Sequence, residues 1–75
     1  MLSAVKAAFN DHVITTRPVL TETGRTAPEG THGFILSVLE DPDERYVAEL
    51  YLGEGIGTSE DTVLTVVRPV DFDIA

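Results

Sequence analysis

The stretch GTHGFILSVLEDPDERYVAELYL, residues 30–52, decides the fold of this chain. Residues 34–39 and residues 46–52 are both rich in β-branched and aromatic side chains, which favour the pleated surface of a β-sheet. Asp41 and Pro42 lie between these two arms, and Pro42 fixes φ near the value needed at the second position of a type I turn. The stretch therefore predicts a long β-hairpin.

Apolar and polar side chains alternate in the second arm, residues 46–52. Alternation with a period of two is typical of a strand that buries one face. Glu49 belongs in water, so the opposite face of this arm is the predicted core. That core face carries Tyr46, Ala48, Leu50 and Leu52.

The first arm alternates less cleanly. Ser37 favours water, which would turn Phe34, Leu36 and Val38 inward. Ile35 and Leu39 would then point outward, although both are apolar. A β-bulge in this arm, or cover on both faces of the sheet, would account for these two side chains.

Shorter elements flank the hairpin. Residues 12–16 and 63–67 are rich in β-branched side chains, and each is followed by Arg-Pro, which stops a strand because proline cannot donate to a ladder. Residues 19–31 are predicted to form a long loop or a loose hairpin. Residues 70–74 alternate apolar and acidic side chains and predict a short last strand or a packed tail.

The first ten residues predict a separate element. Apolar residues recur there at helical spacing, with Ser3 as a candidate N-cap and Asn10 as the stop. We therefore expect a short N-terminal helix over residues 1–10 that plugs one end of a β-domain spanning residues 11–75. A helix of two turns is marginal alone, so fraying is the alternative. The apolar stripe consists of Leu2, Val5, Ala8 and Phe9.

The composition limits the class of protein. Seventy-five residues make one small domain, and the absence of cysteine excludes disulfides and thiolate metal sites. No apolar run approaches the roughly 20 residues of a membrane span. The N-terminal residues, with one lysine and no long apolar run, make a poor signal peptide. We expect a cytoplasmic protein with no membrane partner.

The chain is strongly acidic, with 13 Asp and Glu residues against 5 Lys and Arg residues and a formal charge of −8. Few basic side chains are available to neutralise phosphates, so no nucleic-acid partner is expected. The acidic residues gather at 40–44, 54–61 and 71–73. The simplest interpretation is an acidic, solvated surface.

Four or five short strands around a tight hairpin predict a small, strongly bent barrel. The motif Pro28-x-Gly30-x-x-Gly33-x-Ile35-x-x-Val38, followed by Tyr46-Val47-Ala48-Glu49-Leu50, resembles the GxxGxVxxV…YxVEF pattern of small SH3-like barrels. Such barrels include single-domain bacterial families and the KOW-type and nitrile hydratase β-subunit-like domains. The resemblance covers residues 11–73 and implies a mainly β, SH3-like barrel of about five strands.

The resemblance implies little about activity. KOW-type nucleic-acid binders are usually basic, whereas this chain is acidic, so that function is disfavoured. SH3 domains that bind proline-rich peptides use an aromatic-lined groove, and this chain has no tryptophan.

No catalytic, cofactor or metal site is predicted. His12 and His32 fall in different segments without a ligand spacing between them, one entering a strand and one in a turn. Residues 53–59 are rich in glycine, but they precede a strand and have no lysine, unlike phosphate-binding loops. Because no set of residues converges on a reaction, we expect a protein that is not an enzyme.

Two functions remain open. The first is a non-catalytic protein-interaction module or accessory subunit, because the hairpin carries more apolar side chains than one small core needs. The second is an acidic inhibitor or nucleic-acid mimic of the phage, antitoxin or immunity type, because the charge is −8. Salt distinguishes them, since mimicry weakens steeply with ionic strength.

For the first function, alternation places a partner-binding patch on the outer face of the hairpin. A protein partner or a second copy of the chain would bind there, with Tyr51 as the anchor. The alternative is that the N-terminal helix or the 19–31 loop covers this face. The predicted patch consists of Ile35, Leu39, Val47, Glu49 and Tyr51.

Overall fold

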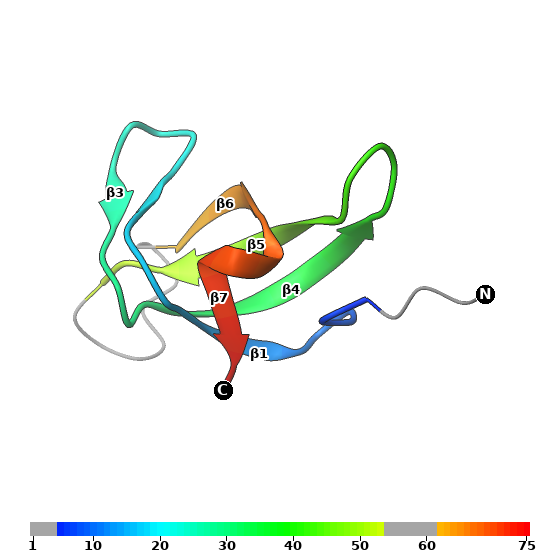
Figure 1. Cartoon of the computed structure of the whole chain (residues 1–75). Helices are drawn as coiled ribbons and strands as arrows, with labels where there is room; N and C mark the ends of the chain where they lie inside the picture. The colour runs from blue at the N-terminus through cyan, green and yellow to red at the C-terminus, as the bar shows by residue number, and fades with distance from the viewer. Residues whose placement is uncertain (1–4, 54–61) are drawn as a thin grey trace.

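The computed structural model describes residues 5–53 and 62–75, and the regular secondary structure within them is almost entirely β (Figure 1). The strands are β1 (His12–Thr15), β2 (Val19–Leu20), β3 (Thr26–Ala27), β4 (His32–Leu39), β5 (Arg45–Tyr51), β6 (Thr62–Val67) and β7 (Phe72–Ile74). They confirm the expected mainly β class and include the short strands predicted on either side of the hairpin. A 3-10 turn, η2 (Pro69–Asp71), precedes β7.

Five strands form one antiparallel sheet in the order β6-β5-β4-β1-β7, and β2 pairs with β3 in a separate hairpin. The first strand of the sheet, β1, lies between β4 and the last strand, β7. In the described part of the chain β6 and β7 are the two edges of this sheet, and they do not pair with each other to close it.

The central hairpin forms as predicted, from β4 and β5, and β4 contains a bulge. Ile35 pairs with Ala48 but Ser37 pairs with Val47, so one extra residue, Leu36, sits in β4 between them. The bulge reverses the alternation of β4, because the extra residue shifts every later side chain to the other face.

The bulge corrects the predicted faces of the first arm. Ile35 was expected to point outward, yet it is completely buried, whereas Phe34 is only half-buried and Leu36 is 38% exposed. Beyond the bulge Val38 packs against the core, as expected. The expected type I turn is also corrected, because the Asp41–Pro42 peptide bond is cis.

The core lies on the inner face of the sheet and confirms the predicted face of the second arm. Tyr46, Ala48 and Leu50 are at most 1% exposed, and Leu52 packs against them. The ring of Tyr46 meets the ring of Phe72 edge to face, with centroids 5.2 Å apart. The buried core consists of Ala7, Val13, Val19, Ala27, Ile35, Tyr46, Ala48, Leu50, Val67 and Phe72.

The predicted N-terminal helix is not found over residues 5–10, and residues 1–4 lie outside the described part. The backbone amides of Lys6 and Ala7 donate to the Tyr46 hydroxyl, at 2.9 and 3.2 Å, instead of to a preceding turn of helix. Ala7 enters the core, while Phe9 is 70% exposed. The segment therefore packs against the core as a non-helical N-terminal arm held by Tyr46.

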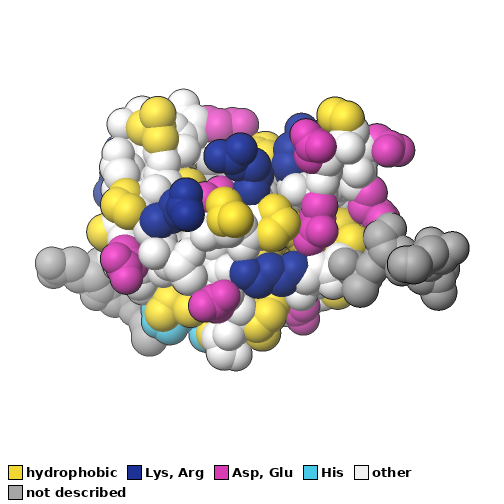
Figure 2. Space-filling view, viewed as in Figure 1, with side chains coloured by type: hydrophobic (Ala, Val, Ile, Leu, Met, Phe, Trp, Pro, Cys, Tyr) yellow, Lys and Arg dark blue, Asp and Glu magenta, His cyan; other side chains and the backbone are white. Residues whose placement is uncertain are grey.

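Acidic and basic side chains are interspersed over the face shown in Figure 2. In two ion pairs of the described chain, Lys6 lies 3.3 Å from Asp73 and Arg17 lies 3.9 Å from Asp71. The face in view therefore presents a mixture of charges and not one continuous acidic surface.

Candidate functional site

The candidate site lies on the side of the five-stranded sheet that points away from the core, which we call the outer face. In β5 the buried residues alternate with half-buried ones, so Arg45, Val47, Glu49 and Tyr51 point outward. The pairing register places residues of the neighbouring strands beside them. Those neighbours are Phe34, Ser37 and Leu39 of β4, and Thr62, Leu64 and Val66 of β6.

Four of the five residues predicted for the partner-binding patch share the outer face. Leu39, Val47, Glu49 and Tyr51 are all half-buried there. Ile35 is not on this face, because the bulge begins after it and leaves it in the core. Leu64 and Val66 of β6, which the sequence did not assign to the patch, extend it and are 50% and 44% exposed.

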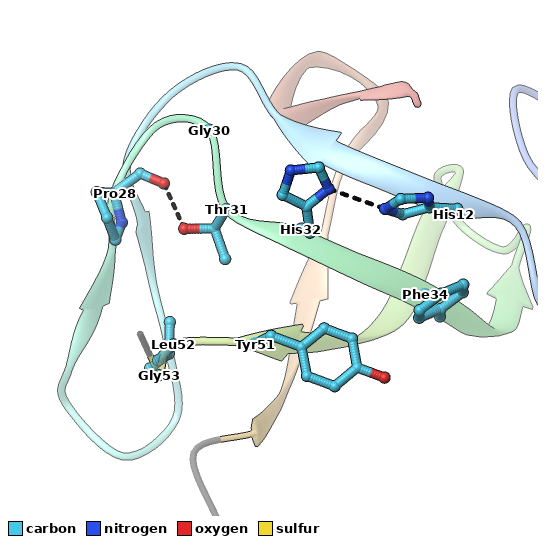
Figure 3. A pocket seen from close by; sticks show the side chains of 9 residues that line it. All are labelled: His12, Pro28, Gly30, Thr31, His32, Phe34, Tyr51, Leu52 and Gly53. Carbon is cyan, nitrogen blue, oxygen red and sulfur yellow. Dashed lines mark hydrogen bonds between the residues drawn. The ribbon is translucent and has the colours of Figure 1, made fainter. Parts of the chain in front are cut away.

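A hollow of about 390 Å³ opens at one end of the outer face (Figure 3). Its lining comes from β1, from the start of β4, from the end of β5 and from the turn that precedes β4. Among the described residues that line it there is no Asp, Glu, Lys or Arg. The lining residues are His12, Pro28, Gly30, Thr31, His32, Phe34, Tyr51, Leu52 and Gly53.

Aromatic rings form one wall of the hollow around Phe34. The His12 ring stacks on Phe34 with centroids 5.0 Å apart and planes 23° apart. Tyr51 meets Phe34 edge to face at 5.9 Å. Such contacts hold large, rigid side chains in place before a ligand arrives, which reduces the entropy lost on binding.

Hydrogen bonds fix the opposite rim, the turn of residues 28–31. The hydroxyls of Thr15 and Thr31 both donate to the Pro28 carbonyl, at 2.9 and 2.6 Å. The amide of Thr31 donates to the Thr15 hydroxyl at 2.9 Å. Gly30 has a φ of 90°, which glycine adopts without strain. Buried Thr15 thus ties the rim to β1.

The two histidines meet beside this aromatic wall. His12 Nε2 and His32 Nδ1 are 2.9 Å apart, at hydrogen-bonding distance, and both side chains are exposed. The sequence prediction placed His32 in a turn, but it is the first residue of β4. The sequence prediction did not pair β1 with β4. That pairing brings the two rings together, and predicting it would have identified this contact.

Few hydroxyl or metal-binding groups line the hollow among the described residues. Thr31 is its only hydroxyl-bearing aliphatic side chain among the described lining residues, and that hydroxyl donates to Pro28. No group of three or more His, Cys, Asp or Glu that could hold a metal ion occurs among residues 5–53 and 62–75. The glycine-rich segment considered as a phosphate loop lies, apart from Gly53, outside the described residues.

Comparisons with known proteins do not identify a family. No family model, no curated protein and no solved structure matches the chain. In the part of the chain that the structure describes, no helix has the length and apolar character needed to cross a membrane.

Proposed function

We propose that this chain is a non-catalytic protein-interaction module that binds an extended segment of a protein partner on its outer face. The observation that carries the proposal is the hollow with its aromatic wall. From Tyr51, which belongs to this wall, the outer face continues along β5 to Val47. Partly exposed aromatic side chains with a polar tip are typical anchors of protein interfaces.

The proposed fold of the module is a small SH3-like barrel. The strand order supports it, because β1 and β7, the first and last strands of the five-stranded sheet, are neighbours. The bulge between Ile35 and Ser37 also supports it, because bulges bend and twist a strand as a small barrel requires. The pattern of residues 28–38 and 46–50 favours the same fold.

The apolar character of the outer face favours a protein partner over a nucleic acid. Leu64 and Val66 on the edge strand, with Val47 beside them, make an apolar surface next to the hollow. The described lining residues of the hollow include no lysine or arginine to hold a phosphate. Side chains of an extended segment could enter the hollow, as in other peptide-binding grooves.

Charge defines the partner further. The chain carries a net charge of −8, and Glu49 lies on the outer face between Phe34 and Leu64. A segment with an apolar anchor and flanking Lys or Arg residues complements this surface, with the charges speeding association. The alternative function, an acidic inhibitor that blocks a basic site, rests on the net charge alone.

A selection from a random peptide library tests the proposal. We expect selected peptides to pair an apolar or aromatic anchor with basic residues, and Tyr51→Ala to weaken their binding at least about tenfold. Leu20→Ala is the matched control, because Leu20 is 70% exposed on β2 and does not line the hollow. Thermal unfolding of each variant checks that both remain folded.

Salt and self-association complete the test. Binding that persists in about 0.5 M NaCl supports an apolar interface, whereas binding that disappears favours the acidic inhibitor. Sedimentation velocity on the protein alone shows whether the chain self-associates, and loss of that association in Tyr51→Ala would identify a second copy as the occupant of the outer face. Peptide binding that is equal in the parent and in Tyr51→Ala would exclude the outer face as the interface.

A further inference from the structure

The histidine pair has a geometry that partner binding does not require. His12 and His32 are the only two histidines in the chain, 20 residues apart in sequence. The register of β1 and β4, in which His12 pairs with Phe34 and Ile14 with His32, places both imidazoles on the outer face. Figure 3 shows the two rings side by side, joined through Nε2 of His12 and Nδ1 of His32.

We propose that His12 and His32 form a bidentate imidazole site for a divalent transition-metal ion such as Cu²⁺, Ni²⁺ or Zn²⁺. Imidazole nitrogen is a common ligand for all three ions. The chain has no cysteine and no other histidine to compete for them. Both imidazoles line the hollow proposed for the peptide, but the metal site needs only these two side chains and can therefore be tested without a peptide.

The two nitrogens are close enough for one ion to reach both. Two nitrogens at about 2.0 Å from a metal, in adjacent corners of a square, are about 2.8 Å apart, as in the tetragonal sites of Cu²⁺ and Ni²⁺. Two nitrogens of a tetrahedral zinc site, with bonds of 2.0–2.1 Å, are about 3.3 Å apart. The observed 2.9 Å between His12 Nε2 and His32 Nδ1 is the length of the hydrogen bond that joins the rings, and it shows that β1 and β4 already hold the two nitrogens within the range of about 2.8–3.3 Å that one ion requires.

Binding replaces the hydrogen bond between the rings. One of the two nitrogens carries the proton of that bond, and this proton must move to the other nitrogen of the same ring, which leaves the net charge unchanged. Each ring must also turn so that both lone pairs point at one ion. Both side chains are exposed, so there is space for this rotation, which costs the His12 ring part of its stacking on Phe34.

The surroundings of the pair suit a metal ion. The two imidazoles line the hollow, which leaves room for water molecules in the remaining coordination positions. The net charge of −8 attracts cations towards the molecule. The described lining residues include no carboxylate, so the site offers nothing to hard cations such as Mg²⁺.

Titration calorimetry with Ni²⁺ on the parent and on His12→Gln, His32→Gln and the double variant tests the site. We expect one ion per chain in the parent and an affinity at least about tenfold lower in each single variant, because one ligand remains where two were linked. The double variant has no histidine and measures the background from surface carboxylates. A Mg²⁺ titration should not distinguish the four proteins.

Electron paramagnetic resonance of the Cu²⁺-loaded parent gives a second readout that needs no variant. Hyperfine coupling of the Cu²⁺ ion to two imidazole nitrogens supports the site, and coupling to one or to none overturns it. An affinity for Ni²⁺ that is the same in the parent and in the double variant would also overturn it. Circular dichroism confirms that each variant is folded before its affinity is compared.

Discussion

At the scale of single residues, Gly33 is the glycine that the hairpin cannot replace. The reason is close approach and not backbone conformation, because only Gly24 and Gly30 have positive φ among the described glycines. A Cβ on Gly33 would collide with the backbone oxygen of Glu49 and would lie 2.7 Å from Cδ2 of Leu50. Residue 33 therefore sets how closely β4 and β5 pack.

Gly33→Val should lower the free energy of unfolding by about 1–3 kcal/mol, the usual cost of overpacking a well-packed site. Urea denaturation measures the loss. The matched control is Gly24→Ala, where φ is 86° but no atom lies within 4 Å of the new Cβ. The control should lose about 1 kcal/mol, through backbone strain alone. A Gly33→Val protein as stable as the parent would show that β5 can move away.

Glu44 is the carboxylate whose ionisation is coupled to the N-terminal arm. It accepts hydrogen bonds from the Tyr46 hydroxyl and from the amide of Lys6, the latter at 2.9 Å. These hydrogen bonds, that of Tyr46 first, hold the pKa of Glu44 below its ordinary value of 4.5. The stability that ionised Glu44 contributes is therefore complete above pH 4.5 and is lost as the pH falls through the lower, folded-state pKa.

Glu44→Gln should therefore be less stable than the parent at neutral pH, and the difference should shrink as the pH falls below 4.5. Urea denaturation at several pH values checks this. Glu40→Gln is the control, because it removes a negative charge from an exposed position in the same connection. An equal pH dependence in the two variants would mean that the charge itself, and not the hydrogen bonds of Glu44, is responsible.

At the scale of elements, the bulge in β4 decides which side chains the sheet buries. It predicts opposite results for two adjacent residues. Ile35→Ala should cost about 2–5 kcal/mol, as for other buried aliphatic side chains. Leu36→Ala should cost less than about 1 kcal/mol, because Leu36 is 38% exposed. Thermal or urea unfolding of the two variants compares them directly, and similar losses would contradict the position of the bulge.

Local patterns in the sequence predicted most of the elements but not how they pair. The alternation of residues 46–52 was enough to identify the buried face of β5, because that strand is regular. The ambiguity of the first arm indicated a bulge, yet its position depends on the pairing of Ile35 and Ser37 with β5. The N-terminal helix was wrong because the Tyr46 hydroxyl, about 40 residues away, accepts the amide hydrogens of Lys6 and Ala7.

The candidate site was likewise predicted only where it depends on local patterns. Alternation alone placed Val47, Glu49 and Tyr51 on one face, where the structure has them. The histidine pair and the hollow could not be predicted in this way, because they depend on which strands are neighbours and on the turn at Pro28. Non-local pairing is thus the information that the local patterns lacked.

At the scale of the whole molecule, Lys6 joins the two ends of the described chain. Its ammonium group donates to the backbone oxygens of Pro69, at 2.6 Å, and of Phe72. It also lies 4.8 Å from the centre of the Phe72 ring and 3.3 Å from a carboxylate oxygen of Asp73. Lys6 therefore ties the N-terminal arm, residues 5–10, to η2 and β7 at one point beside the core.

The charge of the whole molecule predicts how salt affects stability. Added salt weakens ion pairs such as Lys6–Asp73 and Arg17–Asp71, but exposed pairs contribute only about 0.2–1 kcal/mol each. It also screens the repulsion among the acidic residues of a chain with a net charge of −8, and compact, highly charged proteins are destabilised by that repulsion. We expect repulsion to be the larger effect.

Raising NaCl from about 20 to 300 mM should therefore increase the free energy of unfolding, by about 1 kcal/mol, as the Debye length shortens. Urea denaturation at each salt concentration measures the slope. The control is the double variant Glu40→Gln and Asp43→Asn, which removes two of the negative charges and changes the net charge from −8 to −6. Its slope should be shallower, because fewer charges remain to repel one another. A stability that falls with salt in the parent would mean that ion pairs, Lys6–Asp73 first among them, outweigh the repulsion.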